Sequence, residues 1–313
     1  MGGELIWKAL SVILGYIKVG RSASMSRQIR SNVSERQAIV MSAWHVYAVP
    51  VHGWAGSSRV WDFVRWPDDW TVLPYELPGH GTRRDDNPAG AQSPFTIPAA
   101  GEDLADFIRR NVPSGERVLL IGHSMGGQFT LHVHVHHPEL VAGEVVIDPA
   151  LGARQAEIDG QPAMLEALRA DAYGTIESFI QGAFSAYTSQ RVREAIVADI
   201  RRADPRALAD YYQSEYMDPE SFGNWDPAIA MMKRRTKPTF GIYTTPARAD
   251  FERASGTEDV AIWSGGHGHF LFLEDPVRFA DEVVSWAISR GLYENVGAEL
   301  RLVPTTSAST RLS

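Results

Sequence analysis

Residues 117–127 read RVLLIGHSMGG, and this stretch decides the fold. Its run of β-branched and leucine side chains predicts a buried strand, and residues 128–137 are predicted to form a helix. The pattern G-x-S-x-G lies between the two, with Ser124 as its serine. A turn this tight holds the serine on a strained backbone and exposes its hydroxyl above the sheet. A Cβ atom at Gly122 or Gly126 would collide with the neighbouring strand and helix, so both positions require glycine.

The bulk composition favours one large α/β domain with an insertion. The chain has 313 residues, of which 44% are hydrophobic, and this is enough to bury a sizeable core. Its formal net charge of −8 supplies no basic face for phosphates, which argues against a nucleic-acid partner. A cysteine count of zero excludes disulfides, thiolate metal ligands and a cysteine nucleophile, and it fits a cytoplasmic protein.

Strands and helices alternate on both sides of this stretch. The pattern predicts further strands at 44–51, 70–77, 143–147, 239–244 and 260–263, and helices at 98–111 and 277–289. Such alternation predicts an α/β fold with a doubly wound, mostly parallel sheet and helices on both faces. Residues 151–237 instead show consecutive amphipathic helices, for example at 176–187 and 192–202, and we interpret them as an inserted helical lid. The core would comprise residues 41–150 and 238–295.

The two ends of the chain carry their own predictions. Residues 1–40 form an N-terminal extension whose apolar side chains fall on one helical face, which favours an amphipathic helix. Its uninterrupted apolar run, residues 9–17, is too short to cross a bilayer, so we expect no stable membrane span. A secretory signal, a surface or membrane-lying helix, and a loosely attached extension upstream of Met25 or Met41 all stay open. We expect a cytoplasmic protein, with secretion or membrane association as alternatives, and a flexible tail at 296–313.

Residues able to do chemistry follow several of the predicted strands. His52, Ser124 and Asp148 each come directly after a strand, and residues 265–269 follow the last one. In parallel sheets the site lies at the carboxyl ends of the strands. We therefore expect these residues to meet at one edge of the sheet.

Five segments together resemble the α/β-hydrolase superfamily, and they occur in the order usual for it. They are HGW at 52–54, PGHG at 78–81, GHSMGG at 122–127, IDP at 147–149 and GHGHF at 266–270, the last followed by EDP at 274–276. They cover most of residues 44–290, and as a set they are specific. The resemblance implies the α/β-hydrolase fold.

The resemblance also implies a nucleophile and a base. Ser124 would be the nucleophile, and it needs a base because a free hydroxyl is a weak nucleophile. His269 is favoured over His267 as that base, because the family's histidine is followed by an aromatic residue and, five positions on, by an acid. Phe270 and Glu274 meet this pattern.

Two loops beside the serine are expected to complete the site. The backbone N–H groups of Trp54 and Met125 would form the oxyanion hole, which stabilises a tetrahedral intermediate by about 2.7–4 kcal/mol per donor. His52 and Gly53, in the same loop as Trp54, are expected to contact the substrate.

The acid departs from the common pattern of the family. Most relatives carry it after the strand that precedes the histidine strand, but residues 243–247 read YTTPA, with alanine where the acid belongs. Asp148, after the strand that follows Ser124, is the position that some relatives use, and Asp250 is the alternative. Either acid would hold the tautomer of His269 and stabilise its imidazolium form.

An acid in this displaced position resembles two branches of the family. One contains lactonases that use serine, acid and histidine. The other contains cofactor-free dioxygenases that cleave hydroxyquinolones, in which a His–Asp dyad deprotonates the substrate and the serine only orients it. We therefore predict a serine hydrolase of a carboxylic ester or lactone that forms an acyl-enzyme, with the dioxygenase as alternative. A ligand-binding protein without activity is a third hypothesis.

Several further signals predict no cofactor and no metal ion. His132, His134, His136 and His137 resemble a metal tract, but only the first and third share a helical face, and we interpret them as solvent-facing or core-edge side chains. The glycine-rich turns match no phosphate-binding pattern. The basic clusters 201–202 and 233–235 are interpreted as solvated surface.

The partner is expected to be a small molecule, and the oligomeric state stays open. Aromatic side chains of the lid indicate an apolar or ring-bearing substrate, because lid faces line the pocket. They are Tyr173, Phe179, Phe184, Tyr187, Tyr211, Tyr212, Tyr216 and Trp225.

Overall fold

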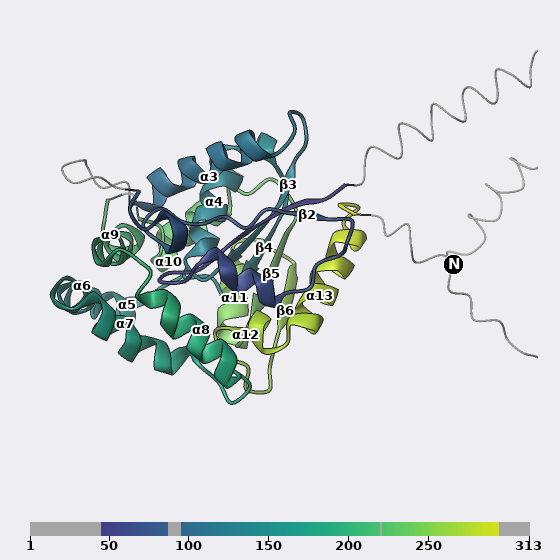
Figure 1. Cartoon of the computed structure of the whole chain (residues 1–313). Coiled ribbons are helices and arrows are strands. Elements are labelled where there is room, and N and C mark those ends of the chain that lie inside the picture. Colours follow the sequence, from purple (N-terminus) through teal and green to yellow (C-terminus); the bar gives the residue numbers. More distant parts are fainter. Residues whose placement is uncertain (1–44, 87–94, 220, 294–313) are drawn as a thin grey trace, which may run out of the picture. The chain divides into compact units, whose positions relative to one another are not determined.

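The computed structural model describes residues 45–86, 95–219 and 221–293. They form a six-stranded parallel sheet in the order β2-β1-β3-β4-β5-β6 (Figure 1). The strands are β1 (Tyr47–Val51), β2 (Thr71–Val72), β3 (Val118–His123), β4 (Val141–Ile147), β5 (Thr239–Tyr243) and β6 (Asp259–Ile262). The predicted α/β fold with a parallel sheet is confirmed.

Helices connect these strands. They are α3 (Ile97–Asn111), α4 (Gly126–His136), α5 (Gln155–Ile158), α6 (Gln161–Ala170), α7 (Ala172–Ile180), α8 (Gln190–Ile200), α9 (Pro205–Tyr216), α10 (Trp225–Met232), α11 (Pro246–Ala254), α12 (Leu271–Glu274) and α13 (Pro276–Ser289). Short 3₁₀ helices occur at Ser58–Phe63, Gly81–Arg83, Pro138–Leu140 and Gln181–Ala183.

Alternate residues of β3 pack into two different cores. Leu119 and Ile121 pack with side chains of α12 and α13. Val118 and Leu120 pack with side chains of α3 and α4. Because successive side chains of a strand point to opposite faces, these two cores lie on opposite faces of the sheet. A strand buried on both faces is read as a continuous apolar run, which residues 118–121 are.

The strand order reverses between β1 and β3. The chain leaves β1 to form β2 on one side and then returns to form β3 on the other side of β1. Val51 at the end of β1 is the partner of Gly122 near the end of β3. The loop that follows β1 and the turn that holds Ser124 therefore lie side by side, at the point where parallel sheets bind ligands.

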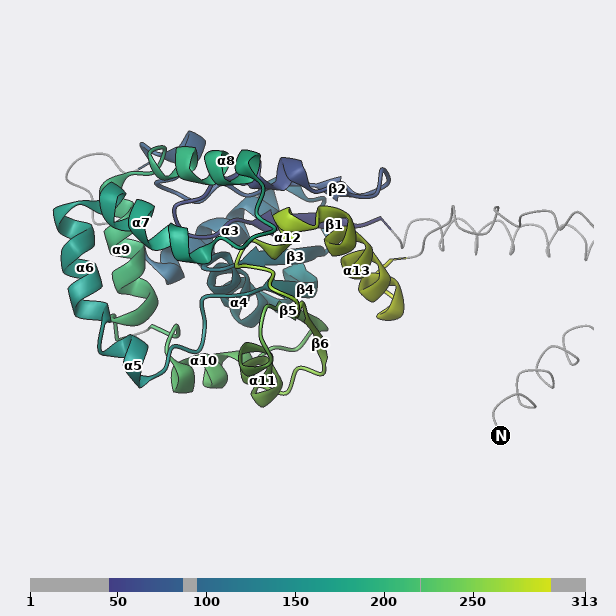
Figure 2. The ribbon, with the colours of Figure 1, turned by 90° about the horizontal axis from the view of Figure 1, so that it is seen from below.

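Residues between β4 and β5 form helices α5 to α10. Helices α5 to α9 gather beyond one end of the sheet (Figure 2). Helix α10 packs Ala228, Met231 and Met232 into the same core as Phe129 of α4, a core to which α9 contributes Ala207 and Tyr211. We call α5 to α9, residues 155–216, the inserted helices. Their assignment as a lid is part of the proposal below.

Two predicted elements have different bounds in the structure. The strand predicted at 70–77 is regular only over Thr71–Val72, with Tyr75 bridging to Val51 further on. Pro74 lies between them, and proline has no N–H to donate to a sheet. The helix predicted at 176–187 is α7, which starts earlier because the Asp171 carboxylate accepts from Gly174 N and caps it.

The predictions for residues 1–40 and 296–313 lie outside the described residues. Within the described residues no helix combines the length and the apolar character needed to cross a bilayer.

Candidate active site

Ser124 lies in the turn between β3 and α4. Its φ of 53° lies in the left-handed region, which side chains other than glycine seldom adopt. A Cβ atom at Gly122 would lie 2.7 Å from Gly127 Cα, and one at Gly126 would lie 2.4 Å from the carbonyl oxygen of Val51. The prediction that both positions need glycine is confirmed, with helix α4 as the obstacle at Gly122 and strand β1 at Gly126.

His269 and Asp148 meet at the carboxyl end of β4. The Nδ1 atom of His269 lies 2.7 Å from Oδ2 of Asp148, a buried residue with a φ of 39°. A carboxylate only accepts, so Nδ1 carries the proton and Nε2 is left with a free lone pair. His269 lines the same cavities as Ser124, and their side chains form no hydrogen bond with each other in this structure. Such contacts are often long before substrate binds.

The alternative residues lie elsewhere. His267 stacks on Tyr187, with ring centroids 4.8 Å apart, and packs edge-on against Trp263. The side chain of Asp250 is 70% exposed on α11 and pairs with Arg253. Among these candidates, only Asp148 contacts the His269 imidazole.

Arg248 contacts the other oxygen of Asp148. Its Nε lies 2.8 Å from Oδ1, and its Nη2 donates to the carbonyl oxygen of Pro149 at 2.7 Å. Burial alone would raise the pKa of Asp148, but the hydrogen bond from His269 and the charge of Arg248 hold it below its usual value. The carboxylate is therefore ionised at neutral pH.

His123 contacts both the backbone and the ring of His269. Its Nε2 donates to the backbone oxygen of His269 at 2.9 Å, and the two rings lie 4.7 Å apart. Burial lowers the pKa of His123 to about 3, so this ring is neutral. It positions the loop of His269 without adding a charge.

Glu274 ties the same loop to the inserted helices. Its Oε2 accepts from Gly268 N at 2.9 Å, and its Oε1 accepts from the hydroxyls of Ser185 (2.7 Å) and Thr188 (2.6 Å). The acid that the family pattern places five positions after His269 therefore positions the histidine loop.

Two backbone N–H groups beside Ser124 are free. Those of Trp54 and Met125 donate to no protein acceptor within the described part of the chain. A Cβ atom at Gly53 would lie 2.9 Å from Ser124 Cβ, so the loop after β1 lies directly against the serine. One of these N–H groups directly follows Ser124 in the chain, and the other directly follows Gly53.

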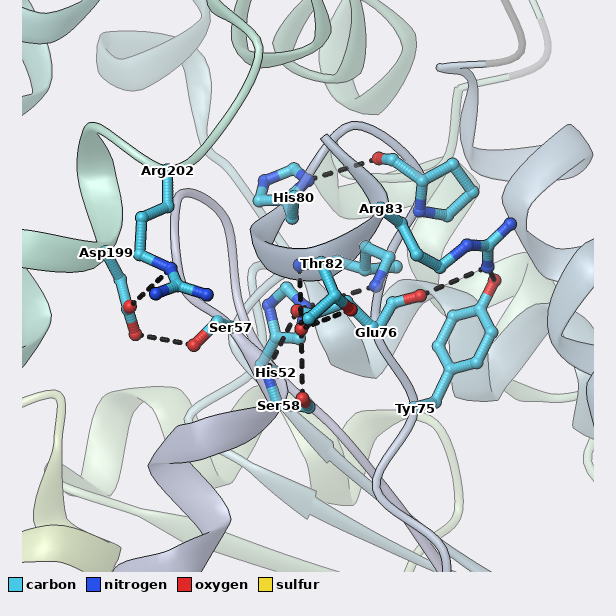
Figure 3. Close-up of polar contacts among 12 residues, drawn as sticks. His52, Ser57, Ser58, Tyr75, Glu76, His80, Thr82, Arg83, Asp199 and Arg202 are labelled. Carbon is cyan, nitrogen blue, oxygen red and sulfur yellow. Dashed lines mark hydrogen bonds and ion pairs between the residues drawn. The ribbon is translucent and has the colours of Figure 1, made fainter. Parts of the chain in front are cut away.

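A cluster of buried polar side chains holds this loop (Figure 3). The Nδ1 atom of His52 donates to the next residue's carbonyl oxygen (2.8 Å), and its Nε2 lies 3.2 Å from Leu77 N and 3.1 Å from Oε1 of Glu76. Burial alone would raise the pKa of Glu76, but His52 and the hydrogen bonds from Ser58 bring it to about 2. Both nitrogens of His52 are occupied by protein atoms, which gives it a supporting place in the site.

Two contacts link the loop to the inserted helices. Ser57 Oγ donates to Oδ2 of Asp199 at 2.6 Å, and Arg202 pairs with the same carboxylate (Figure 3). The Trp54 indole donates to the carbonyl oxygen of Leu208 at 3.0 Å. The inserted helices therefore help to position Trp54, including its free backbone N–H.

Two cavities meet at Ser124. A narrow one of about 50 Å³ runs toward Val60, Ile196 and Phe272 and is lined mainly by apolar side chains. A larger one of about 620 Å³ extends beneath the inserted helices to Glu215 and Arg248. The expectation of an apolar pocket fits the first cavity, whereas the second also has polar walls.

Three residues outside this site could hold a cation. Glu102, His132 and His137 bring one ligand atom each within 4.8 Å of one another. Arg109, however, donates to His137 Nδ1 at 2.9 Å, and a metal-bound histidine normally faces an acceptor there. The prediction of no metal ion is kept.

The interpretation of His134 and Arg235 as surface or core-edge residues is wrong. His134 Nδ1 lies 2.8 Å from Glu144, and both side chains are fully buried. Arg235 is also buried and pairs with Glu144 and Glu252. These charges lie inside because they neutralise one another, which sequence spacing does not reveal.

Sequence reasoning missed three residues of the site. His123 gave a weak signal, as a polar residue that ends an apolar strand just before Ser124. Arg248 and Glu215 gave none, because both come from segments distant in sequence from Ser124.

Known proteins resemble this chain in sequence. A model of the alpha/beta hydrolase family matches residues 51–282. A pimeloyl-[acyl-carrier protein] methyl ester esterase of Vibrio vulnificus is 24% identical over 250 residues, covering 76% of this chain and 93% of that protein.

Solved structures share the fold. An esterase from Thermogutta terrifontis superimposes with a TM-score of 0.65 at 19% identity, over 78% of this chain and 90% of its own. The enol-lactonase from Burkholderia xenovorans gives a TM-score of 0.64 at 14% identity, over 78% and 92%. The chain therefore belongs to the alpha/beta hydrolase family, as an esterase-like hydrolase.

Proposed function

We propose that this enzyme cleaves a carboxylic ester or lactone of a small molecule through an acyl-enzyme on Ser124. The observation that carries the proposal is the 2.7 Å hydrogen bond from His269 Nδ1 to Asp148, beside a serine on a strained turn. The similarity to an esterase of a carboxylic methyl ester supports the same bond type. The inserted helices would act as a lid, since they line the cavities that contain Ser124.

The reaction follows from the arrangement. Ser124 Oγ attacks the ester carbonyl carbon while Nε2 of His269 accepts its proton, and Asp148 stabilises the imidazolium. The carbonyl oxygen becomes an oxyanion that accepts from Trp54 N and Met125 N. His269 then gives the proton to the leaving alkoxide, and the alcohol departs. Water, deprotonated by the same Nε2, attacks the acyl-enzyme, and collapse releases the acid and restores the Ser124 hydroxyl.

The test is hydrolysis of ester and lactone panels by wild type, Ser124→Ala and His269→Ala. Loss of the nucleophile or the base should lower kcat by about 10³-fold or more. The variants must keep the wild-type melting temperature. Full activity of Ser124→Ala on the esters that the wild-type enzyme hydrolyses would contradict the proposal.

The same variants separate hydrolysis from cofactor-free oxygenation. An oxygenase would consume oxygen with a hydroxyquinolone, keep much of this activity in Ser124→Ala, and lose it in His269→Ala. We expect no oxygen uptake by any of the three proteins, as measured with an oxygen electrode.

A further inference from the structure

Glu215 is a buried acid that the proposed reaction does not use. It belongs to α9, and its side chain is 3% exposed. It lines the larger cavity together with Ser124 and His269. A carboxyl group in the wall of the substrate cavity needs a role, because burying an unpaired carboxylate is unfavourable.

Among the residues that the structure describes, the neighbours of Glu215 supply hydrogen bonds but no paired cation. Gln128 Nε2 donates to its Oε1 at 2.9 Å, and this amide is held in turn by the carbonyl oxygen of Ala150. Burial raises the pKa of Glu215 to about 8, although a hydrogen bond with Tyr216 lowers it somewhat. The group is therefore mostly neutral at pH 7. A neutral carboxyl carries one O–H donor, which a carboxylate lacks.

Other polar groups collect at this end of the cavity. The side chains of Gln161, Tyr216 and Arg248 line it with Glu215, whereas Trp54, Met164 and Phe179 line the rest. The Arg248 guanidinium is already paired with Asp148. The cavity therefore combines apolar walls with hydrogen-bonding groups, and the Arg248 charge among them is already paired.

We propose that the Glu215 carboxyl donates a hydrogen bond to an uncharged oxygen of the substrate, a carbonyl, ether or hydroxyl oxygen located away from the scissile ester. This inference rests on the proposed function and names its substrate class: esters with a second oxygen function in the chain that enters the larger cavity. An aliphatic ester without that oxygen leaves the donor unpaired and is a poorer substrate.

The test is a set of esters of equal chain length that differ in one oxygen. Each carries a single keto oxygen at a successive position of the acyl or the alcohol chain, and the hydrocarbon parent is the reference. Hydrolysis is followed by titration of the released acid. We expect one position to raise kcat/KM about 5- to 10-fold over the parent, the value of one hydrogen bond.

Two substitutions identify the donor. Glu215→Gln keeps an N–H donor and should retain the preference, whereas Glu215→Leu should abolish it; the preference is measured within each variant as the ratio of kcat/KM for the preferred ester to kcat/KM for the parent. Glu157→Gln is the matched control, since Glu157 is an exposed acid that lines the same cavity. A preference that survives in Glu215→Leu, or a wild type without any preference, would overturn the inference while leaving the hydrolase standing. Failure of the wild type to hydrolyse every ester would overturn both.

The pH dependence of KM in the wild-type enzyme tests the same inference. As pH rises through about 8, Glu215 loses its proton and its donor, so KM for the preferred ester should rise while KM for the parent stays constant. Glu215→Gln should show no such rise. Among the described residues, the titratable or polar groups that face Glu215 are Tyr212, Tyr216 and Gln128, and Arg248 acts on Tyr216. A KM for the preferred ester that stays constant or falls above pH 8 would overturn the inference.

Discussion

Arg248 Nε lies 2.8 Å from Oδ1 of Asp148, so the carboxylate that accepts from His269 is also paired with a guanidinium. Arg248 belongs to α11, directly after β5. The family resemblance places the acid of most relatives in this turn. Here the turn supplies a cation, and the acid comes from the end of the neighbouring strand β4.

The first prediction concerns this cation. Arg248→Gln removes a charge that lowers the pKa of Asp148, so the acid limb of the pH profile of kcat/KM should move to higher pH. At pH 7 the loss should be about fivefold or less, because the partly exposed pair is screened by solvent. Arg253→Gln, on the exposed side of the same helix, is the control. An unchanged acid limb in Arg248→Gln would show that the pair does not influence the reaction.

Replacement of Asp148 should lower activity far more than replacement of Arg248. Asp148→Asn keeps the shape but no longer stabilises the imidazolium, and kcat should fall by about 10⁴-fold. Asp250→Asn should keep wild-type activity, because this side chain is exposed and pairs only with Arg253 in the structure. The reverse ranking of the two variants would refute the assignment of Asp148.

Close contact between Gly53 and Ser124 gives a third prediction. The Cβ atom of Gly53→Ala would lie 2.9 Å from Ser124 Cβ, so the loop with the Trp54 N–H must move. A displacement of about 1 Å at a reacting group lowers kcat about 100-fold. Gly160→Ala is the control, since its Cβ atom would make an ordinary contact of 3.6 Å with a backbone oxygen, outside both cavities, and activity should not change. Activity of Gly53→Ala within twofold of wild type would contradict the assigned oxyanion position.

Glu76 links stability to pH. Its pKa is about 2 in the folded protein against 4.5 ordinarily, so its stabilisation is fully present above pH 4.5 and is lost as pH falls toward 2. Glu76→Gln should lower the free energy of unfolding at pH 7 by about 2 kcal/mol and flatten its decline between pH 4.5 and 3. Urea unfolding at several pH values measures this, with the exposed Asp62→Asn as control. Parallel curves for wild type and Glu76→Gln would exclude this role.

The central part of the fold could be predicted because its determinants are local. The apolar run of β3, the glycines around Ser124 and the helix that follows are adjacent in sequence, and the steric reasons for Gly122 and Gly126 involve neighbouring elements. Asp148 and His269 could be proposed because each follows a strand of one parallel sheet. The length of β2 was not predicted: the strand expected at 70–77 contains Pro74, which has no N–H to donate, and only Thr71–Val72 is regular.

The supporting residues could not be predicted, because their roles depend on packing between distant segments. Glu215 lies 91 positions after Ser124, and only the fold of the inserted helices brings it to the same cavity. Arg248 reads as one charge on an amphipathic helix. His134 and Arg235 look solvated by composition, yet inside the protein Arg235 pairs with Glu144 and His134 donates a hydrogen bond to it. In each case the partner that determines the role is not a sequence neighbour.

The most direct test of an activated Ser124 is labelling with a fluorophosphonate, followed by intact mass. We expect one covalent adduct on wild type, located on Ser124 by peptide mapping and absent from Ser124→Ala and His269→Ala. Arg253→Gln should be labelled as fast as wild type. A folded wild-type protein that forms no adduct, or an adduct that persists in Ser124→Ala, would contradict the account.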